Sequence, residues 1–121
     1  MNQFLLHLIG DFIIQNDWMA LNKKKKNLIG ELACQIHCIL YTLPFLLITT
    51  NYTQILLIYL NHYILDRTNI VSWFLAYRNF VFNIDNFGFS KDRPFAISIW
   101  LNIITDNTFH IIFNYLILSY I

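Results

Sequence analysis

The chain has 121 residues, of which 57% are hydrophobic and 12% are charged, and its formal net charge is +1. The length predicts one domain, residues 1–121, and the composition is too apolar for an ordinary soluble domain, so the sequence indicates an integral membrane protein. The small net charge, with one short run of lysines, excludes a nucleic-acid-binding surface, which needs many clustered basic side chains.

Four apolar stretches each approach the roughly 20 residues that a membrane-spanning helix requires. They lie at about residues 2–21, 29–50, 53–77 and 96–121. We therefore expect an all-α fold, a four-helix transmembrane bundle. A soluble four-helix bundle is the alternative. It is less favoured, because such a bundle should have polar outer faces, which these stretches lack.

Basic residues predict the orientation of this bundle. Lys23–Lys26 follow the first stretch, and Arg78, Lys91 and Arg93 follow the third. The second connection and both termini carry no Lys or Arg, so the positive-inside rule places both termini outside the cytoplasm. The expected location is the inner, or cytoplasmic, membrane.

Histidines and aspartates recur within these apolar stretches at a fixed spacing. Three pairs are four residues apart: His7 with Asp11, His62 with Asp66, and Asp106 with His110. Residues four apart share one face of a helix, with Cβ atoms about 5–6 Å apart, so each pair can chelate an ion. Counted from the cytoplasmic ends of the predicted helices, the three aspartates reach the same depth, and His37 reaches a comparable level. The sequence thus predicts a polar His/Asp layer at mid-membrane.

A metal would explain this layer, because a charged side chain at the bilayer centre costs about 2.5–3.5 kcal/mol. Imidazole and carboxylate ligands suit Zn, Mn or Fe, so we expect one or two divalent ions, with zinc favoured. The predicted ligands are His7, Asp11, His37, His62, Asp66, Asp106 and His110. The alternative is a hydrogen-bonded network in which His and Asp neutralise each other and fix helix packing.

Polar neighbours of these residues are expected to orient the ligands or the substrate by hydrogen bonding. They are Gln15, Tyr41, Asn102, Asn107 and Asn114. Arg67 is expected to pair with Asp17 or Asp66, or to bind a phosphate group. Lys23–Lys26 are interpreted as a topology signal.

The motifs H-x-x-G-D-F-x-x-Q, H-x-x-x-D-R and D-N-x-x-H, with one further helical histidine, extend over nearly the whole chain. They resemble those of the domain of unknown function 3307 family, small bacterial and phage membrane proteins. The matching positions are His7, Gly10, Asp11, Gln15, His37, His62, Asp66, Arg67, Asp106, Asn107 and His110. The resemblance implies that these positions belong together, and it implies no particular activity. A looser similarity is to small membrane proteins described as metal-dependent hydrolases.

Three functions are compatible with this pattern. The first is a metal-dependent hydrolase acting on a lipid-like or phosphorylated substrate, in which Asp11, Asp66 or Asp106 acts as general base and Arg67 or Asn107 orients an oxygen of the substrate. The second is a metal-ion or proton transporter or channel. Four short helices without an inverted repeat or a broken helix disfavour an alternating-access carrier unless the chain oligomerises. The third is a structural or interaction protein. The expected partners are the lipid bilayer, a lipid-like substrate and, for a transporter, further copies of the chain.

Overall fold

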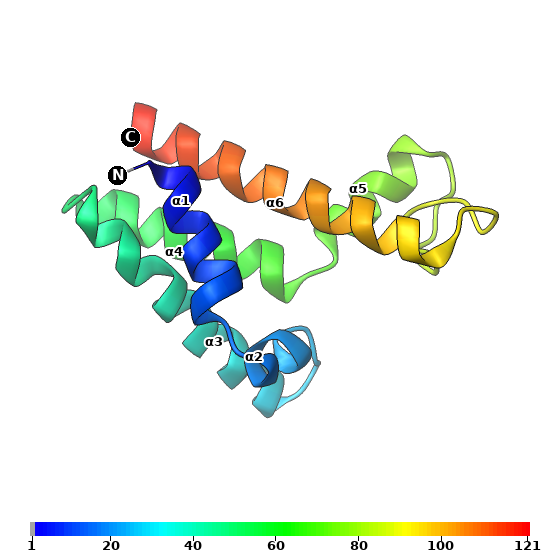
Figure 1. The fold of residues 1–121 in the computed structure, drawn as a ribbon, viewed down its shortest axis with the longest axis horizontal. Coiled ribbons are helices and arrows are strands. Elements are labelled where there is room, and N and C mark those ends of the chain that lie inside the picture. Colours follow the sequence, from blue (N-terminus) through cyan, green and yellow to red (C-terminus); the bar gives the residue numbers. More distant parts are fainter. Residues whose placement is uncertain (1) are drawn as a thin grey trace. The chain divides into compact units, whose positions relative to one another are not determined.

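The computed structural model describes residues 2–121, which form six α-helices, a π-helix and a 3₁₀-helix, with no strand among them (Figure 1). The elements are α1 (Gln3–Leu8), the π-helix η1 (Ile9–Ile14), α2 (Asp17–Asn22), α3 (Leu28–Thr42), the 3₁₀-helix η2 (Leu43–Leu47), α4 (Tyr52–Arg67), α5 (Ile70–Arg78) and α6 (Phe95–Tyr120). The predicted all-α class is confirmed. The chain divides into two compact units, the first ending at Thr68 and including His110–Ile121, and the second comprising Asn69–Phe109.

Two of the predicted helices, 2–21 and 53–77, are each interrupted. The chain leaves η1 at Gln15, and the Asn16 side chain accepts a hydrogen bond of 2.9 Å from the Met19 amide at the start of α2. Likewise α4 ends at Arg67, Thr68 is extended, and Asn69 precedes α5. Short polar side chains such as Asn and Thr bond to nearby backbone and so favour helix ends over helix interiors. The membrane depths predicted for Asp11 and Asp66 were counted along unbroken helices. Because both helices are interrupted, these depths do not apply.

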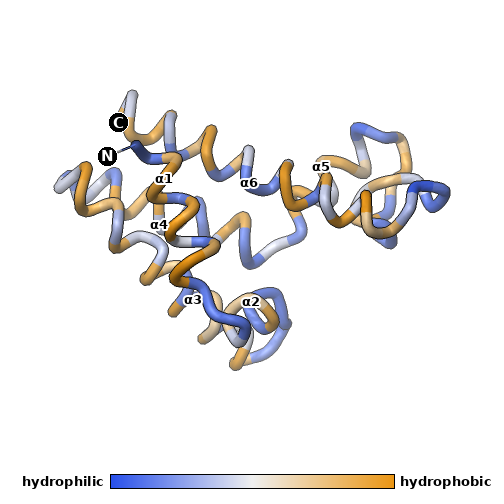
Figure 2. The backbone as a smooth tube through the Cα atoms, viewed as in Figure 1, coloured by the Kyte–Doolittle hydropathy of each residue, from blue (hydrophilic) through white to orange (hydrophobic). Residues whose placement is uncertain are grey.

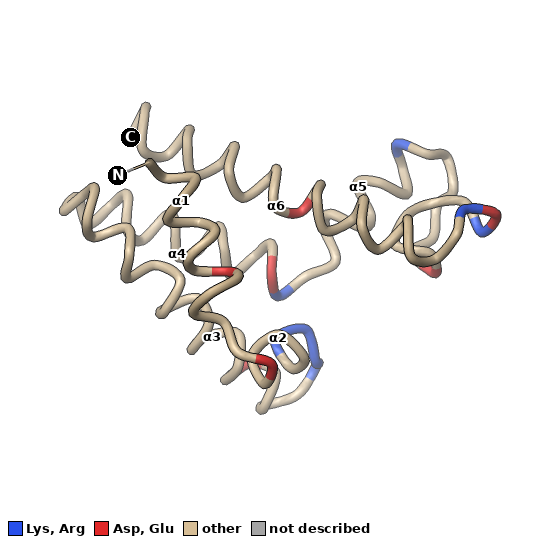
Figure 3. The backbone as a smooth tube through the Cα atoms, viewed as in Figure 1, with Lys and Arg blue, Asp and Glu red and all other residues tan. Residues whose placement is uncertain are grey.

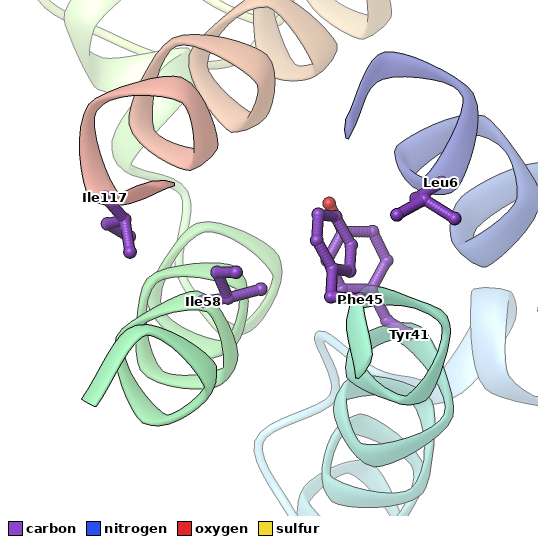
Figure 4. Packing of buried hydrophobic residues seen from close by; sticks show 5 residues of the cluster. All are labelled: Leu6, Tyr41, Phe45, Ile58 and Ile117. Carbon is purple, nitrogen blue, oxygen red and sulfur yellow. The ribbon is translucent and has the colours of Figure 1, made fainter. Parts of the chain in front are cut away.

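The first unit is held together by a small apolar cluster to which five helical segments contribute (Figure 4). Its members are Leu6 of α1, Tyr41 of α3, Phe45 of η2, Ile58 of α4 and Ile117 of α6. Burying an apolar side chain of this size contributes about 1.5–3 kcal/mol. The cluster fixes the mutual placement of the elements that carry most of the predicted ligands.

The outer surfaces of the first unit remain apolar. Figure 2 shows orange, hydrophobic colour over much of the helices and blue colour along the loop between α2 and α3. Large exposed side chains on α3, η2 and α4 are Leu28, Ile29, Leu32, Ile39, Leu43, Leu46, Leu47, Tyr52, Leu56, Leu60 and Ile64.

One helical stretch among residues 2–121, Leu28–Leu47, is long and apolar enough to cross a membrane. It has a mean hydropathy of 1.3 and is 44% buried within the protein, so its length and composition suit a membrane span and a core helix alike. The apolar stretch Gln3–Ile14 is shorter. The predicted arrangement of four spans stays a prediction.

The second unit consists of α5, the loop that follows it and the first part of α6. Gly88 in this loop has φ +87° and packs directly against the Ser72 carbonyl oxygen, so a side chain here would clash as well as strain the backbone. Asn102 on α6 donates hydrogen bonds to Ser72 Oγ at 2.9 Å and to the Phe87 carbonyl oxygen at 3.2 Å. These bonds fix the loop against both helices of the unit.

Candidate metal centre

Three helical elements of the first unit direct four acidic and imidazole side chains toward one point. Asp11 comes from the π-helix η1, His37 from α3, and His62 and Asp66 from successive turns of α4. Spacing of four residues places His62 and Asp66 on one face, as predicted from the sequence. π-Helical turns are rare and occur frequently at functional sites, and here the π-helix carries Asp11.

Gly10 lets this π-helix approach α3 closely. A Cβ atom on Gly10 would lie 2.5 Å from Tyr41 Cδ2, well inside van der Waals contact. The Tyr41 ring in turn stacks on His62, with ring centroids 3.5 Å apart and an interplanar angle of 14°. The glycine beside Asp11 therefore allows the ring that supports His62 to lie against η1.

The ligand atoms of the four residues converge. His37 Nε2 and His62 Nε2 are 2.8 Å apart, and each is 3.2 Å from Asp11 Oδ1. Asp66 Oδ2 lies 2.9 Å from His37 Nε2 and 3.2 Å from His62 Nε2. All four atoms lie within 4.8 Å of one another, which makes them one group able to hold a metal ion.

Protons alone satisfy this arrangement poorly. An imidazole nitrogen carries at most one hydrogen. Protons on both Nε2 atoms would place two N–H groups face to face, and bare nitrogens would direct lone pairs at carboxylate oxygens. A single proton would form one N–H···N bond between the histidines and leave Asp11 Oδ1, which is buried and makes no well-oriented hydrogen bond, without a donor from either ring. A divalent cation would remove these conflicts, because the lone pairs of both histidines and of Asp66 would then be directed at it, with Asp11 beside it.

The dimensions and burial of the group fit such an ion. Tetrahedral sites with bonds of about 2.0–2.2 Å separate their ligand atoms by about 3.3–3.6 Å. The distance between the two histidine nitrogens, and those from them to the carboxylate oxygens, are 2.8 to 3.2 Å, only slightly smaller. The side chains of His37, His62 and Asp66 are at most 3% exposed, and that of Asp11 is 10% exposed. Four of the seven predicted ligands therefore form a buried group that could hold a metal.

Two further predicted ligands lie beside this group. His110 Nε2 is 3.2 Å from Asp66 Oδ1, so the two oxygens of Asp66 face different histidines. His7 Nδ1 is 2.8 Å from the Tyr41 hydroxyl and 3.6 Å from Asp11 Oδ2. The carboxylates of Asp11 and Asp66 thus connect the central group to two more imidazoles, both buried.

Tyr41 and Asn114 complete this network. Asn114 Nδ2 donates a hydrogen bond of 2.8 Å to the Tyr41 hydroxyl oxygen, which leaves the tyrosine proton available to His7 Nδ1. Tyr41 and Asn114 are both fully buried. Since the same tyrosine stacks on His62, it orients two of the four histidines.

The other predicted residues have different partners. Gln15 donates to the backbone carbonyl of Asp11 at 3.2 Å, which supports the turn that carries the carboxylate. Asn102 bonds within the second unit as described above, and Asn107 donates to the Ile103 carbonyl of its own helix at 2.8 Å. Asp106 lies on α6 in the second unit, four residues before His110. Participation of Asn102, Asn107 and Asp106 in the metal centre stays a prediction.

Arg67 holds the loop between α2 and α3, residues 23–27, which we call the lysine loop. Its Nε is 3.0 Å from Glu31 Oε2, and its Nη1 donates to the carbonyls of Lys23 at 3.1 Å and Lys25 at 2.6 Å. These partners replace the expected pairing with Asp17 or Asp66. In the structure the guanidinium anchors the loop.

Lys23 is the residue of this site that sequence reasoning missed. Its Nζ lies 2.7 Å from Asp66 Oδ2, and its side chain is 16% exposed. Four consecutive lysines are typical of a topology signal, and nothing in their order distinguishes the first. Only the path of the loop identifies Lys23. Figure 3 shows the blue of these lysines in the loop between α2 and α3, on a chain whose helices are largely uncharged.

Comparison with known proteins identifies the family. No curated protein and no solved structure matches the chain. The model of one family, described as protein of unknown function (DUF3307), matches residues 1–119. The match spans almost the whole chain, including every residue of the metal centre. The chain therefore belongs to the DUF3307 family.

Proposed function

We propose that the protein is a membrane-bound, metal-dependent hydrolase acting on a phosphorylated or lipid-like substrate. One observation carries the proposal: the nitrogen and oxygen atoms of Asp11, His37, His62 and Asp66 converge in a buried group, all within 4.8 Å of one another. Imidazole with carboxylate is a ligand set for zinc, with manganese and iron as alternatives.

The four residues divide into ligands and a base. His37, His62 and Asp66 are the most deeply buried, and three ligands with one open position are typical of catalytic zinc sites. A divalent ion held there would supply Lewis acidity and lower the pKa of a bound water. Asp11 is the most accessible member, and its carboxylate lies beside the other three residues, so it is suited to accept a proton from that water.

The membrane location rests on the apolar outer faces of α3 and α4. Exposed Leu and Ile side chains recur along both helices, and large exposed apolar patches are typical of surfaces that contact membrane or protein. The lysine loop would face the cytoplasm by the positive-inside rule, with both termini on the opposite side. Since Lys23 contacts Asp66, the metal centre would then open toward the cytoplasmic surface.

Elemental analysis of the full chain, purified in detergent and exposed in turn to Zn, Mn and Fe, tests the metal. We expect at least one tightly bound ion per chain, and more than about 100-fold weaker binding in His62→Ala and Asp66→Asn. Leu60→Ala, an exposed position on the same helix, is the control and should bind like the wild type. Absence of bound metal from the wild-type protein refutes the proposal.

Hydrolysis is tested on the metal-loaded protein with bis(p-nitrophenyl) phosphate and with phosphatidic acid in mixed micelles. We expect turnover that Asp11→Asn abolishes while metal remains bound, since Asp11 is assigned as base. Metal flux into liposomes without turnover of either compound would instead identify a transporter and would overturn the enzymatic part of the proposal.

A further inference from the structure

Lys23 contacts the metal centre itself. Its ammonium group is 2.7 Å from Asp66 Oδ2, the same oxygen that lies 2.9 Å from His37 Nε2. A lysine at this distance from a metal-ligand atom adds a positive charge to the centre.

The position of Lys23 is fixed from two sides. Arg67 donates to the Lys23 backbone carbonyl, as described above, and Lys24 Nζ donates to the carbonyl oxygens of Asp66 at 2.9 Å and Thr68 at 2.8 Å, at the end of α4. Both contacts tie the lysine loop to the helix end that carries Asp66. Lys23 is thus directed to the centre by a built loop and does not reach it as a long, freely moving surface side chain.

The charges around Asp66 then indicate the class of ligand. With neutral histidines, the carboxylates of Asp11 and Asp66 would balance the two positive charges of a divalent ion. Asp66 would then be shared between that ion and the Lys23 ammonium, two cations that repel each other. A bound anion that contacts both cations would reduce this repulsion.

We propose that Lys23 binds a phosphate group of the substrate, together with the ion held by His37, His62 and Asp66; this rests on the function proposed above. A phosphate has several oxygens and can therefore contact the ion and the ammonium at once, and lysine binds phosphate as a compact point charge. In the metal-free protein Lys23 neutralises Asp66 instead. The substrate class is a phosphate ester, either free or as the headgroup of a lipid.

Inorganic phosphate is the direct probe. Its affinity for the zinc-loaded full chain in detergent micelles is measured by titration calorimetry for the wild type, Lys23→Met, Lys23→Arg and Lys26→Met. We expect about 10- to 100-fold weaker phosphate binding in Lys23→Met, the range for losing a charged hydrogen bond. Lys23→Arg should retain most of the affinity because the positive charge remains. Lys26→Met, an exposed position in the same loop, should bind like the wild type.

Zinc affinity is the second readout. It should be equal or higher in Lys23→Met, because a competing cation has been removed. Equal phosphate affinity in Lys23→Met and the wild type overturns the inference, and so does a loss of zinc binding in Lys23→Met, since Lys23 would then support the metal site itself. A wild-type chain that binds no zinc refutes the proposed function. A wild-type chain that binds zinc but no phosphate refutes only the role of Lys23.

Phosphatidic acid and glycerol phosphate in separate titrations distinguish the two sources of the phosphate. Tighter binding of phosphatidic acid in mixed micelles assigns a lipid headgroup, and tighter binding of glycerol phosphate assigns a soluble ester. In either case Lys23→Met should weaken binding by the same factor as for inorganic phosphate. If Lys23→Met binds both phosphatidic acid and glycerol phosphate as tightly as the wild type does, the inference is contradicted.

Discussion

Replacing Gly10 by alanine should destabilise the first unit and weaken metal binding together. The added Cβ would lie 2.5 Å from Tyr41 Cδ2, 3.1 Å from Cε2 and 3.2 Å from Cγ, so the ring must move by about 1 Å to reach ordinary contact. The ring is held on His62 by stacking and through its hydroxyl by His7 and Asn114. Overpacking of this kind costs about 1–3 kcal/mol.

The assay is urea unfolding of the detergent-solubilised protein together with zinc affinity measured by competition with a chelating dye. We expect a loss of about 1–3 kcal/mol in the free energy of unfolding and about tenfold weaker zinc binding, the effect of disturbing a group that orients a ligand. Ile13→Ala, at a position 75% exposed in the same π-helix, should change neither quantity appreciably. If Gly10→Ala keeps both the stability and the zinc affinity of the wild type, the proposed role of the Gly10–Tyr41 contact is refuted.

Two further predictions concern the groups around the centre. Tyr41→Phe keeps the stacking but leaves Asn114 Nδ2 buried without its acceptor, so urea unfolding should show a loss of about 1–3 kcal/mol in the free energy of unfolding. Tyr115→Phe, at an exposed position, is the control and should keep the wild-type free energy of unfolding. Equal stability of the two variants would contradict the network. Arg67→Gln removes the bonds to the lysine loop, so limited trypsin digestion should cleave that loop several-fold faster than in the wild type. Arg78→Gln is the control and should be cleaved in the loop at the wild-type rate. If Arg67→Gln is also cleaved at the wild-type rate, contacts other than those of Arg67 hold the loop.

Spacing was sufficient to predict that His62 and Asp66 come together in the first unit. His62 and Asp66 lie on one face of α4 because four residues make about one helical turn, and the helical class followed from long apolar stretches. The joining of Asp11 and His37 to this pair depends on packing between helices. The recurrence of His and Asp in successive stretches indicated it, but did not fix which atoms would face one another.

Other features were beyond sequence reasoning for physical reasons. The breaks at Asn16 and Thr68 depend on side-chain caps that compete with helix continuation by small free energies, so apolar patterning alone extended both helices too far. A π-helix differs from an α-helix by one residue per hydrogen-bonded turn, and the pattern of η1 does not distinguish them. The contact of Lys23 with Asp66 joins positions 43 apart through a folded loop, and four identical neighbours conceal it.

The four central ligand residues all lie between positions 11 and 66, which has a consequence for biosynthesis. The ribosome completes α1 to α4, with Asp11, His37, His62 and Asp66, before any of α6 exists. Because domains tend to fold from the N-terminus during synthesis, a nascent chain could acquire its ion early. His110 and Asn114 would then be added from α6 to a site that already holds a cation, and metal supply during translation would influence how the last helix docks.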